Sequence, residues 1–150
     1  MCGIAGYIGK QTISESAILK TLELMKNRGP DHRDWCCIEN PNSQIYLLHS
    51  RLGILDLDER SNQPFQHKKF TLVFNGEIYN YIEVRKVLIQ KGYFFQTNSD
   101  TEVLLKAYEE YGEACVDHFE GMWSFAIWDQ YENKLFLSRD RFAGKPLYFL

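Results

Sequence analysis

The sequence predicts an α+β fold in which sheets and helices form the layers of a sandwich. Strand-like runs come in groups, and helix-like segments stand between these groups instead of alternating with single strands. A doubly wound parallel sheet requires such alternation, so the order of the elements argues against it. The chain has 150 residues, of which 45% are hydrophobic and 25% charged. This composition is typical of one globular domain.

Six segments have the residue preferences of β-strands. They are rich in branched apolar and aromatic side chains, and turn-forming residues separate them. The last two flank a short polar link, which is the pattern of a hairpin. The predicted strands are Gly3–Ile8, Trp35–Ile38, Ile45–His49, Phe70–Phe74, Met122–Asp129 and Lys134–Arg139.

Three segments have helical periodicity, with apolar residues recurring on one face. Thr12 with Glu15, and Ser99 with Glu102, match the capping box that begins many helices. A glycine follows each of the last two segments, as is common where a helix ends. The predicted helices are Ser14–Asn27, Ile82–Lys91 and Asp100–Tyr111.

Charge and hydropathy argue against several classes of partner. The net charge is −3, so no basic surplus favours nucleic-acid phosphates or anionic lipid. No run approaches the roughly 18 apolar residues that span a bilayer, and the first residues lack the basic and apolar regions of a signal peptide. We therefore expect a cytoplasmic location, with small molecules or proteins as partners and no nucleic acid or membrane.

The cysteines are expected to be free thiols, because a cytoplasmic chain of this size seldom needs disulfides. No CxxC pair and no HxxxH spacing is present, so the sequence predicts no metal site. The four cysteines are Cys2, Cys36, Cys37 and Cys115.

Cys2 is the first candidate for chemistry. Removal of Met1 would leave a cysteine whose free α-amino group lies beside its own thiol. An unperturbed thiol is only a few per cent ionised at pH 7, and an α-amino group with a pKa of about 7.7 to 8.0 is well matched to accept its proton. The alternative is that Cys2 is an ordinary small residue after the initiator.

Five further residues each have a structural alternative. Asn75-Gly76 is typical of a tight hairpin turn, but an amide side chain and a glycine N–H can also stabilise an oxyanion. Arg51 is either a solvated charge or a clamp for a substrate carboxylate. Asp100 suits the N-terminus of a helix with or without a ligand. Glu77, beside the Asn-Gly pair, indicates nothing alone.

Six motifs, taken together and in order, resemble the glutaminase domain of class II glutamine amidotransferases. The resemblance covers almost the whole chain and is specifically to glutamine-hydrolysing asparagine synthetases, which the third and fourth motifs match particularly well. The motifs are Met1–Gly6 (MCGIAG), Arg28–Asp31 (RGPD), Ser50–Leu57 (SRLGILDL), Phe74–Tyr81 (FNGEIYNY), Ser99–Glu102 (SDTE) and Arg139–Phe142 (RDRF).

The resemblance implies the fold of an N-terminal-nucleophile hydrolase, which is an αββα four-layer sandwich. Residues 1–150 would form a class II glutamine amidotransferase domain that is incomplete at its C-terminal end, because the chain stops in the strand-like run Pro146–Leu150. An ATP-dependent synthetase domain would follow. The implied partners are L-glutamine and that domain, and a homodimer is left open. ATP and Mg²⁺ would serve the synthetase domain only, with no cofactor in this chain.

The resemblance also assigns roles by position. The implied reaction is hydrolysis of glutamine to glutamate and ammonia through a glutamyl thioester. The carried-over site consists of Cys2 as nucleophile, Asn75 and Gly76 as the oxyanion hole, Arg51 for the substrate α-carboxylate, Glu77 and Asp100 for its α-ammonium, and the backbone near Leu52 and Ile54 as lining.

The sequence departs from the family pattern twice and leaves two other readings open. The family usually has a glycine shortly after Arg-Gly-Pro-Asp, where this chain has Asp34 nearby, and Phe-Gly-X-Lys where it has Phe142-Ala143-Gly144-Lys145. The first departure bears on the loop over glutamine and the second on contact with a partner domain. The alternatives are the glutaminase domain of another class II amidotransferase, for amino-sugar or nucleotide synthesis, and a catalytically silent fragment or glutamine-binding module.

Overall fold

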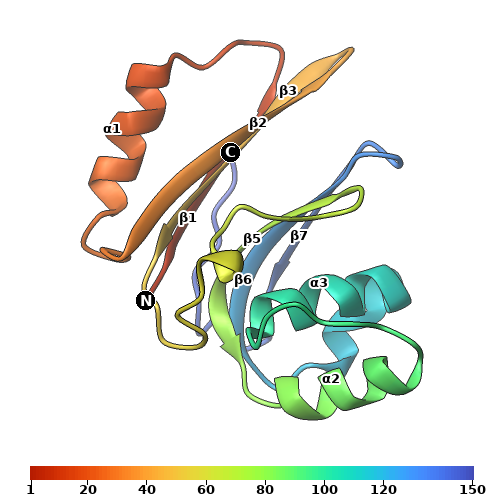
Figure 1. Ribbon diagram of the computed structural model, residues 1–150. Coiled ribbons are helices and arrows are strands. Elements are labelled where there is room, and N and C mark those ends of the chain that lie inside the picture. The colour runs from red at the N-terminus through yellow and green to blue at the C-terminus, as the bar shows by residue number, and fades with distance from the viewer.

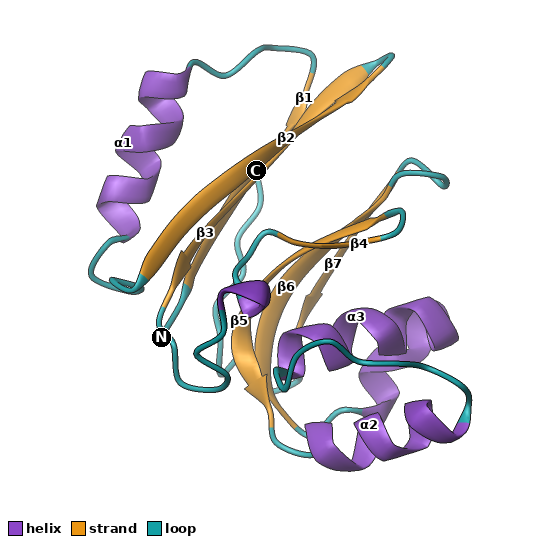
Figure 2. Ribbon diagram, in the orientation of Figure 1, coloured by secondary structure: helices purple, strands orange, loops and turns teal.

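Two sheets lie face to face, and helices cover the outer side of each (Figure 1). The computed structural model describes all 150 residues. The layers run from α1 through the two sheets to α2 and α3 (Figure 2). The structure therefore confirms the α+β class and the αββα order of layers.

The first sheet, sheet A, has three antiparallel strands in the order β1-β3-β2. Helix α1 covers its outer face, where Ile18 and Leu22 are buried against Tyr46 and Leu48. These residues recur at the helical and strand periods that bury one face of each element. The elements are β1 (Gly3–Gly9), α1 (Glu15–Met25), β2 (His32–Asn40) and β3 (Ser43–Arg51).

The second sheet, sheet B, has four antiparallel strands in the order β4-β5-β6-β7. Helices α2 and α3 cover its outer face, and two short 3₁₀ helices lie in the connections. The elements are η1 (Glu59–Ser61), β4 (Phe65–His67), β5 (Phe70–Ile78), α2 (Tyr81–Gln90), α3 (Asp100–Tyr111), η2 (Gly112–His118), β6 (Gly121–Asp129) and β7 (Lys134–Arg139).

Alternation along β5 divides its side chains between two cores. Phe70, Leu72 and Phe74 pack against the helices in the largest hydrophobic cluster. Val73 faces sheet A, in a smaller cluster between the sheets that also contains Ile45, Leu47, Ala126 and Trp128. By the same alternation, Asn75 points toward sheet A.

Two local predictions are wrong. Ser14, not Thr12, caps α1, because the Ser14 hydroxyl accepts the Ala17 N–H at 3.3 Å. The run Pro146–Leu150 forms no strand. The Asp140 carboxylate ends β7 by accepting backbone N–H groups of the turn that follows, and this turn leads the chain away from the sheet.

The capping box predicted at α3 is half formed. The Ser99 hydroxyl accepts the Glu102 N–H at 3.3 Å, as predicted. The Glu102 carboxylate does not return to Ser99 but accepts the N–H groups of Gln96 and Thr97. Glu102 therefore fixes the loop before α3 as well as the helix itself.

Asn75 and Gly76 do not form a hairpin turn. They lie inside β5 and pair with Ser124 and Trp123 of β6. A tight Asn-Gly turn requires positive φ at both residues, and neither residue has it. Pairing with a full-length neighbouring strand has overridden the local turn preference.

Candidate active site

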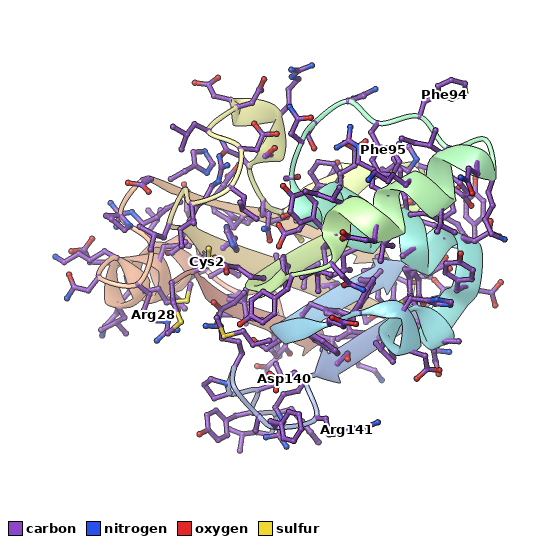
Figure 3. The ribbon with its side chains drawn as sticks, turned by 90° about the horizontal axis from the view of Figure 1, so that it is seen from below. Cys2, Arg28, Phe94, Phe95, Asp140 and Arg141 are labelled. Atoms are coloured by element: carbon purple, nitrogen blue, oxygen red, sulfur yellow. The ribbon has the colours of Figure 1, made fainter.

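One pocket is lined by all eight residues to which the sequence assigns a role, together with nine others. It lies where the start of β1 meets the end of β3, since Gly3 pairs with Ser50. Figure 3 shows Cys2 between the two sheets in a view from below. The predicted residues in the lining are Cys2, Arg51, Leu52, Ile54, Asn75, Gly76, Glu77 and Asp100.

The Cys2 thiol lies directly before the first residue of β1, where two hydrogen bonds hold the residue. The Leu52 N–H donates to its Sγ at 3.4 Å, and Arg28 Nε donates to the Cys2 carbonyl oxygen at 3.0 Å. Burial raises the pKa of the Cys2 thiol, although the Leu52 N–H and the positive charges of the N-terminus and Arg51 oppose that shift. The thiol therefore needs a base to become a nucleophile near neutral pH.

The pocket edge of β5 presents a backbone donor at Gly76. Phe74 and Ile78 direct their N–H groups away from β6, to Gln63 Oε1 at 2.6 Å and to Asp100 Oδ2 at 3.1 Å. Donors alternate between the two edges of a strand, so the Gly76 N–H shares this edge and is not used in pairing with β6. A side chain at Gly76 would meet the Met122 carbonyl oxygen at 2.2 Å, so only glycine fits there.

The side-chain amide of Asn75 has an oxygen atom without a hydrogen-bond partner. The residue is 4% exposed, and its Oδ1 has no hydrogen-bond partner in the protein. Its register partner Ser124 is fully buried, and the Ser124 hydroxyl is unpaired too. Buried polar atoms without partners are costly and recur at functional sites.

The carboxylates of Asp100 and Glu77 line the same pocket as the Cys2 thiol. Asp100 begins α3, and burial raises its pKa to about 6, with the neighbouring Glu77 adding to that shift. The Ile78 and Thr101 N–H groups oppose it. A bound cation would favour the ionised form of Asp100, so the pair is suited to an ammonium group.

Arg51 lines the pocket while holding the loop that follows it. Its Nη1 donates to Asn62 Oδ1 at 2.6 Å and to the Asp58 carbonyl at 3.3 Å. Its Nη2 donates to the Asp56 carbonyl and, at 3.5 Å, to that of Leu55. No protein group accepts the Nε–H. Sequence reasoning missed that the guanidinium also supports residues 55–62.

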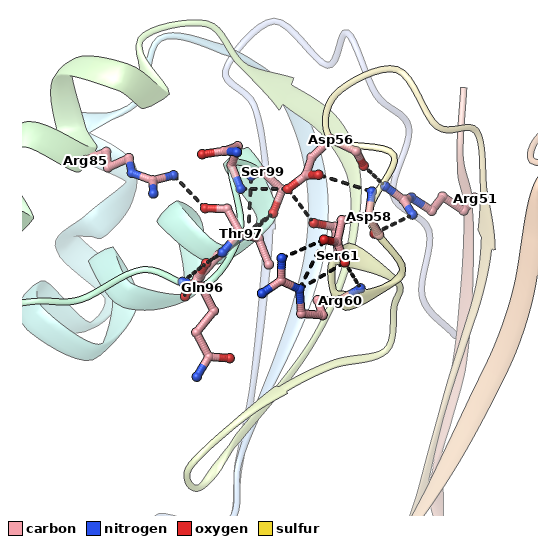
Figure 4. A network of polar contacts seen from close by, with 11 residues as sticks. Arg51, Asp56, Asp58, Arg60, Ser61, Arg85, Gln96, Thr97 and Ser99 are labelled. Carbon is pink, nitrogen blue, oxygen red and sulfur yellow. Dashed lines mark hydrogen bonds and ion pairs between the residues drawn. The ribbon is translucent and has the colours of Figure 1, made fainter.

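A polar network joins this loop to the segment before α3 (Figure 4). The Asp56 carboxylate accepts the Asn98 N–H at 2.6 Å and the Ser61 hydroxyl at 3.0 Å. Because Arg51 holds the Asp56 carbonyl and Asp100 lies two residues after Asn98, the network links the two predicted ends of the substrate site.

Lys145 and Gln63 also line the pocket, and the sequence analysis assigned neither to it. Lys145 is 2% exposed, and the only partner of its ammonium is the Met1 sulfur. The burial of Lys145 depends on the turn that the Asp140 carboxylate holds, and local composition does not reveal that turn.

All four cysteines are free. No group of three or more His, Cys, Asp or Glu residues is placed to hold a metal ion. No helix combines the length and the apolar character needed to cross a bilayer.

The fold, two facing sheets between layers of helices, is that of the N-terminal-nucleophile hydrolases. A solved structure of this class is similar, the glutamine phosphoribosylpyrophosphate amidotransferase of Bacillus subtilis complexed with ADP and GMP. It matches with a TM-score of 0.52 and 22% identity over 63% of this chain and 23% of that one. At this identity the likeness shows the fold alone.

The model of the glutamine amidotransferase domain family matches residues 1–150, and the chain belongs to that family. It is 37% identical over 157 residues to asparagine synthetase (glutamine-hydrolyzing) 3 of Bacillus subtilis, covering 99% of this chain and 25% of that protein. It is also 37% identical to the asparagine synthetase (glutamine-hydrolyzing) of Sandersonia aurantiaca, over 99% of this chain and 28% of that protein. The chain thus corresponds to the N-terminal glutaminase domain of these synthetases and spans about a quarter of their length.

Proposed function

We propose that this chain hydrolyses L-glutamine to L-glutamate and ammonia, with Cys2 as the nucleophile. The observation that carries the proposal is the meeting, in one pocket, of the Cys2 thiol, the Gly76 N–H on an open strand edge and the Asn75 side-chain amide, whose Nδ2 is a donor. A nucleophile facing preorganised donors is the arrangement that acyl transfer requires.

Removal of Met1 is part of the proposal. While Met1 is attached, the Cys2 nitrogen is an amide and cannot accept a proton. After its removal the free α-amino group takes the thiol proton, and the thiolate attacks the carboxamide carbon of glutamine. Departure of Met1 also opens the part of the pocket that its side chain shares with Lys145.

The reaction then passes through two tetrahedral intermediates. In the first, Asn75 and the Gly76 N–H stabilise the oxyanion, and ammonia leaves after taking a proton from the Cys2 α-ammonium. A γ-glutamyl thioester of Cys2 remains. The Cys2 α-amino group takes a proton from water, which attacks the thioester carbonyl carbon. The C–S bond then breaks, and glutamate leaves while the α-ammonium returns the proton to the thiolate.

Glutamine is held by charge at its amino-acid end. Glu77 and Asp100 bind the α-ammonium, and Leu52 and Ile54 line the pocket. Arg51 binds the α-carboxylate with its unused Nε–H and with Nη2, whose contact to the Leu55 carbonyl is long at 3.5 Å. The other Arg51 contacts keep the guanidinium in place.

In the whole protein, the ammonia would amidate aspartate to asparagine in an ATP-dependent synthetase domain after residue 150. ATP and Mg²⁺ would serve that synthetase domain. A reducing compartment such as the cytoplasm suits a thiol nucleophile among free cysteines.

The test combines the intact mass of the purified full-length protein with ammonia and glutamate release from glutamine. We expect Met1 to be absent, and Cys2→Ala to abolish release while leaving the folded protein intact. Activity that persists in Cys2→Ala would refute the nucleophile. A processed, folded wild-type protein that releases no ammonia would instead support a silent glutamine-binding module.

A further inference from the structure

The pocket edge of β5 has no neighbouring strand beyond Leu72, because β4 pairs only with Phe70–Leu72. Two side chains occupy this edge at Phe74. The Phe74 N–H donates to Gln63 Oε1 at 2.6 Å, and His49 Nε2 lies 3.2 Å from the Phe74 carbonyl oxygen. The backbone groups of the residue just before Asn75 are thus both held by side chains.

The histidine comes from the opposite sheet. His49 lies on β3, two residues before Arg51, and is completely buried. Burial lowers the pKa of His49 to about 3, and the nearby charges of Arg51 and His32 act in the same direction. The imidazole is therefore neutral across the working pH range, and the tautomer with its proton on Nε2 donates to Phe74.

The glutamine comes from the loop that Arg51 supports. Gln63 is 5% exposed and follows Asn62, whose Oδ1 accepts from Arg51. Its Nε2 donates to Thr101 Oγ1 at 3.2 Å, next to Asp100. Through Gln63, the Phe74 peptide is connected to the start of α3.

We propose that His49 and Gln63 are positioning residues for glutamine hydrolysis, which hold Phe74 from two sides and so fix where Asn75 and the Gly76 N–H point. The inference rests on the proposed function and extends it to two residues that do not touch the reacting atoms. His49 sets the distance between β3, which pairs with the strand after Cys2, and β5, which carries Asn75 and Gly76. Gln63 sets the same strand against α3.

The physical reason is geometric. An unsupported strand edge can tilt, and displacing a donor by about 1 Å is enough to cost roughly 100-fold in rate. Ordinary strand pairing would prevent tilting, but a paired edge would also consume the Gly76 N–H. Two side-chain contacts at Phe74 leave the Gly76 N–H open while the strand stays fixed.

The experiment uses the full-length, processed protein with His49→Leu and Gln63→Leu. Each variant should lower kcat for glutamine hydrolysis by about 10- to 100-fold. The KM for glutamine and the inhibition constant of the product glutamate should stay within about 3-fold, since Arg51, Glu77 and Asp100 are unchanged. His49→Gln places a neutral donor at similar reach, and we expect it to recover most of kcat without a change in the pH profile.

Tyr46→Phe is the matched control. On the far side of sheet A, the part-buried Tyr46 hydroxyl accepts the Ile13 N–H at 3.3 Å and donates to Gln44 Oε1 at 2.8 Å. Its loss leaves a backbone N–H unpaired, as Gln63→Leu does, but away from the pocket. Tyr46→Phe should lower the Tm by an amount similar to Gln63→Leu and leave kcat unchanged.

Two outcomes overturn the inference. In one, the wild type is active, and the kcat values of His49→Leu and Gln63→Leu equal that of the wild type. In the other, kcat falls only in proportion to the fraction unfolded, and His49→Gln does not recover it. If the processed wild type itself releases no ammonia, the proposed function fails and this inference fails with it.

Discussion

The layer between the two sheets has two unlike ends. At one end Ile45, Leu47, Val73, Ala126 and Trp128 form an apolar cluster. At the other end, each two residues away from a cluster member on the same strand, lie His49, Asn75 and Ser124, all buried and each with an unpaired polar atom. Trp128 Nε1 is the only such atom at the apolar end.

The difference separates stabilisation from function within a single layer. Each buried polar atom without a partner costs about 1–3 kcal/mol, so the pocket end reduces the stability that the apolar end supplies. Buried polar groups without partners recur at functional sites. Substitutions at the two ends should therefore affect different measurements.

Among substitutions that keep Cys2, Asn75→Ala should have the largest effect on activity. Losing one oxyanion donor typically lowers kcat by about 10²- to 10³-fold, while removing an amide whose Oδ1 is unpaired costs little stability. Steady-state ammonia release and thermal unfolding of the same sample test both parts. Undiminished turnover in Asn75→Ala would remove this residue from the oxyanion hole.

Leu47→Ala is the counterpart at the apolar end. Leu47 is 2% exposed and packs between the sheets. Truncating a buried leucine costs about 2–5 kcal/mol, because apolar area is lost and a cavity remains. Urea unfolding should show this loss, with kcat of the folded fraction near that of the wild type. A kcat that falls as far as in Asn75→Ala would mean that the two ends are not separable.

Local sequence pattern predicted the three α-helices and six of the seven strands, and it missed the short strand β4. The family resemblance predicted the eight lining residues from Cys2 to Asp100. Local pattern failed where a tertiary contact decides. Whether Asn75-Gly76 turns or extends depends on β6, and the burial of Lys145 depends on Asp140.

The His49 and Gln63 contacts escaped prediction for the same reason. They join β3 and a loop to β5 over separations of 25 and 11 residues, and neither residue type is distinctive at its position. Only the unpaired edge of β5, which is a property of the sheet, explains why Phe74 needs two side-chain partners.

Asp100→Asn should raise stability at neutral pH. The native pKa of Asp100 is raised to about 6 from its ordinary 3.8, so the native state holds a proton that the unfolded state releases. Stability therefore falls as pH rises from about 4 to about 6, by roughly 1–3 kcal/mol. Asparagine keeps an acceptor for the Ile78 N–H and carries no charge. Urea midpoints should favour Asp100→Asn at pH 7.5 and converge with wild type near pH 4.

The same carboxyl group should make glutamine binding depend on pH. An α-ammonium group favours ionised Asp100, so the KM for glutamine should rise as pH falls below about 6. In Asp100→Asn the KM should be higher at pH 7.5 and its rise on acidification smaller. A variant that is no more stable at pH 7.5 would show that burial of this carboxylate carries no cost at the pocket end.

Ala143→Gly should have the smallest effect on stability, and it tests whether the backbone turn beside the pocket is strained. Ala143 has φ of 55°, in the left-handed region, at the place where the family pattern usually has glycine. The turn is retained because the Asp140 carboxylate accepts N–H groups from Phe142, Gly144 and Lys145. A left-handed alanine costs roughly 1–2 kcal/mol, and the extra freedom of unfolded glycine offsets part of the relief. We expect the free energy of unfolding to rise by about 0.5 kcal/mol, with kcat unchanged.

Ala17→Gly is the control. Ala17 lies in the right-handed helix α1, so its replacement by glycine should lower the free energy of unfolding. If both substitutions destabilise, the turn holds no strain and the cost of the pocket end lies in its unpaired polar groups alone.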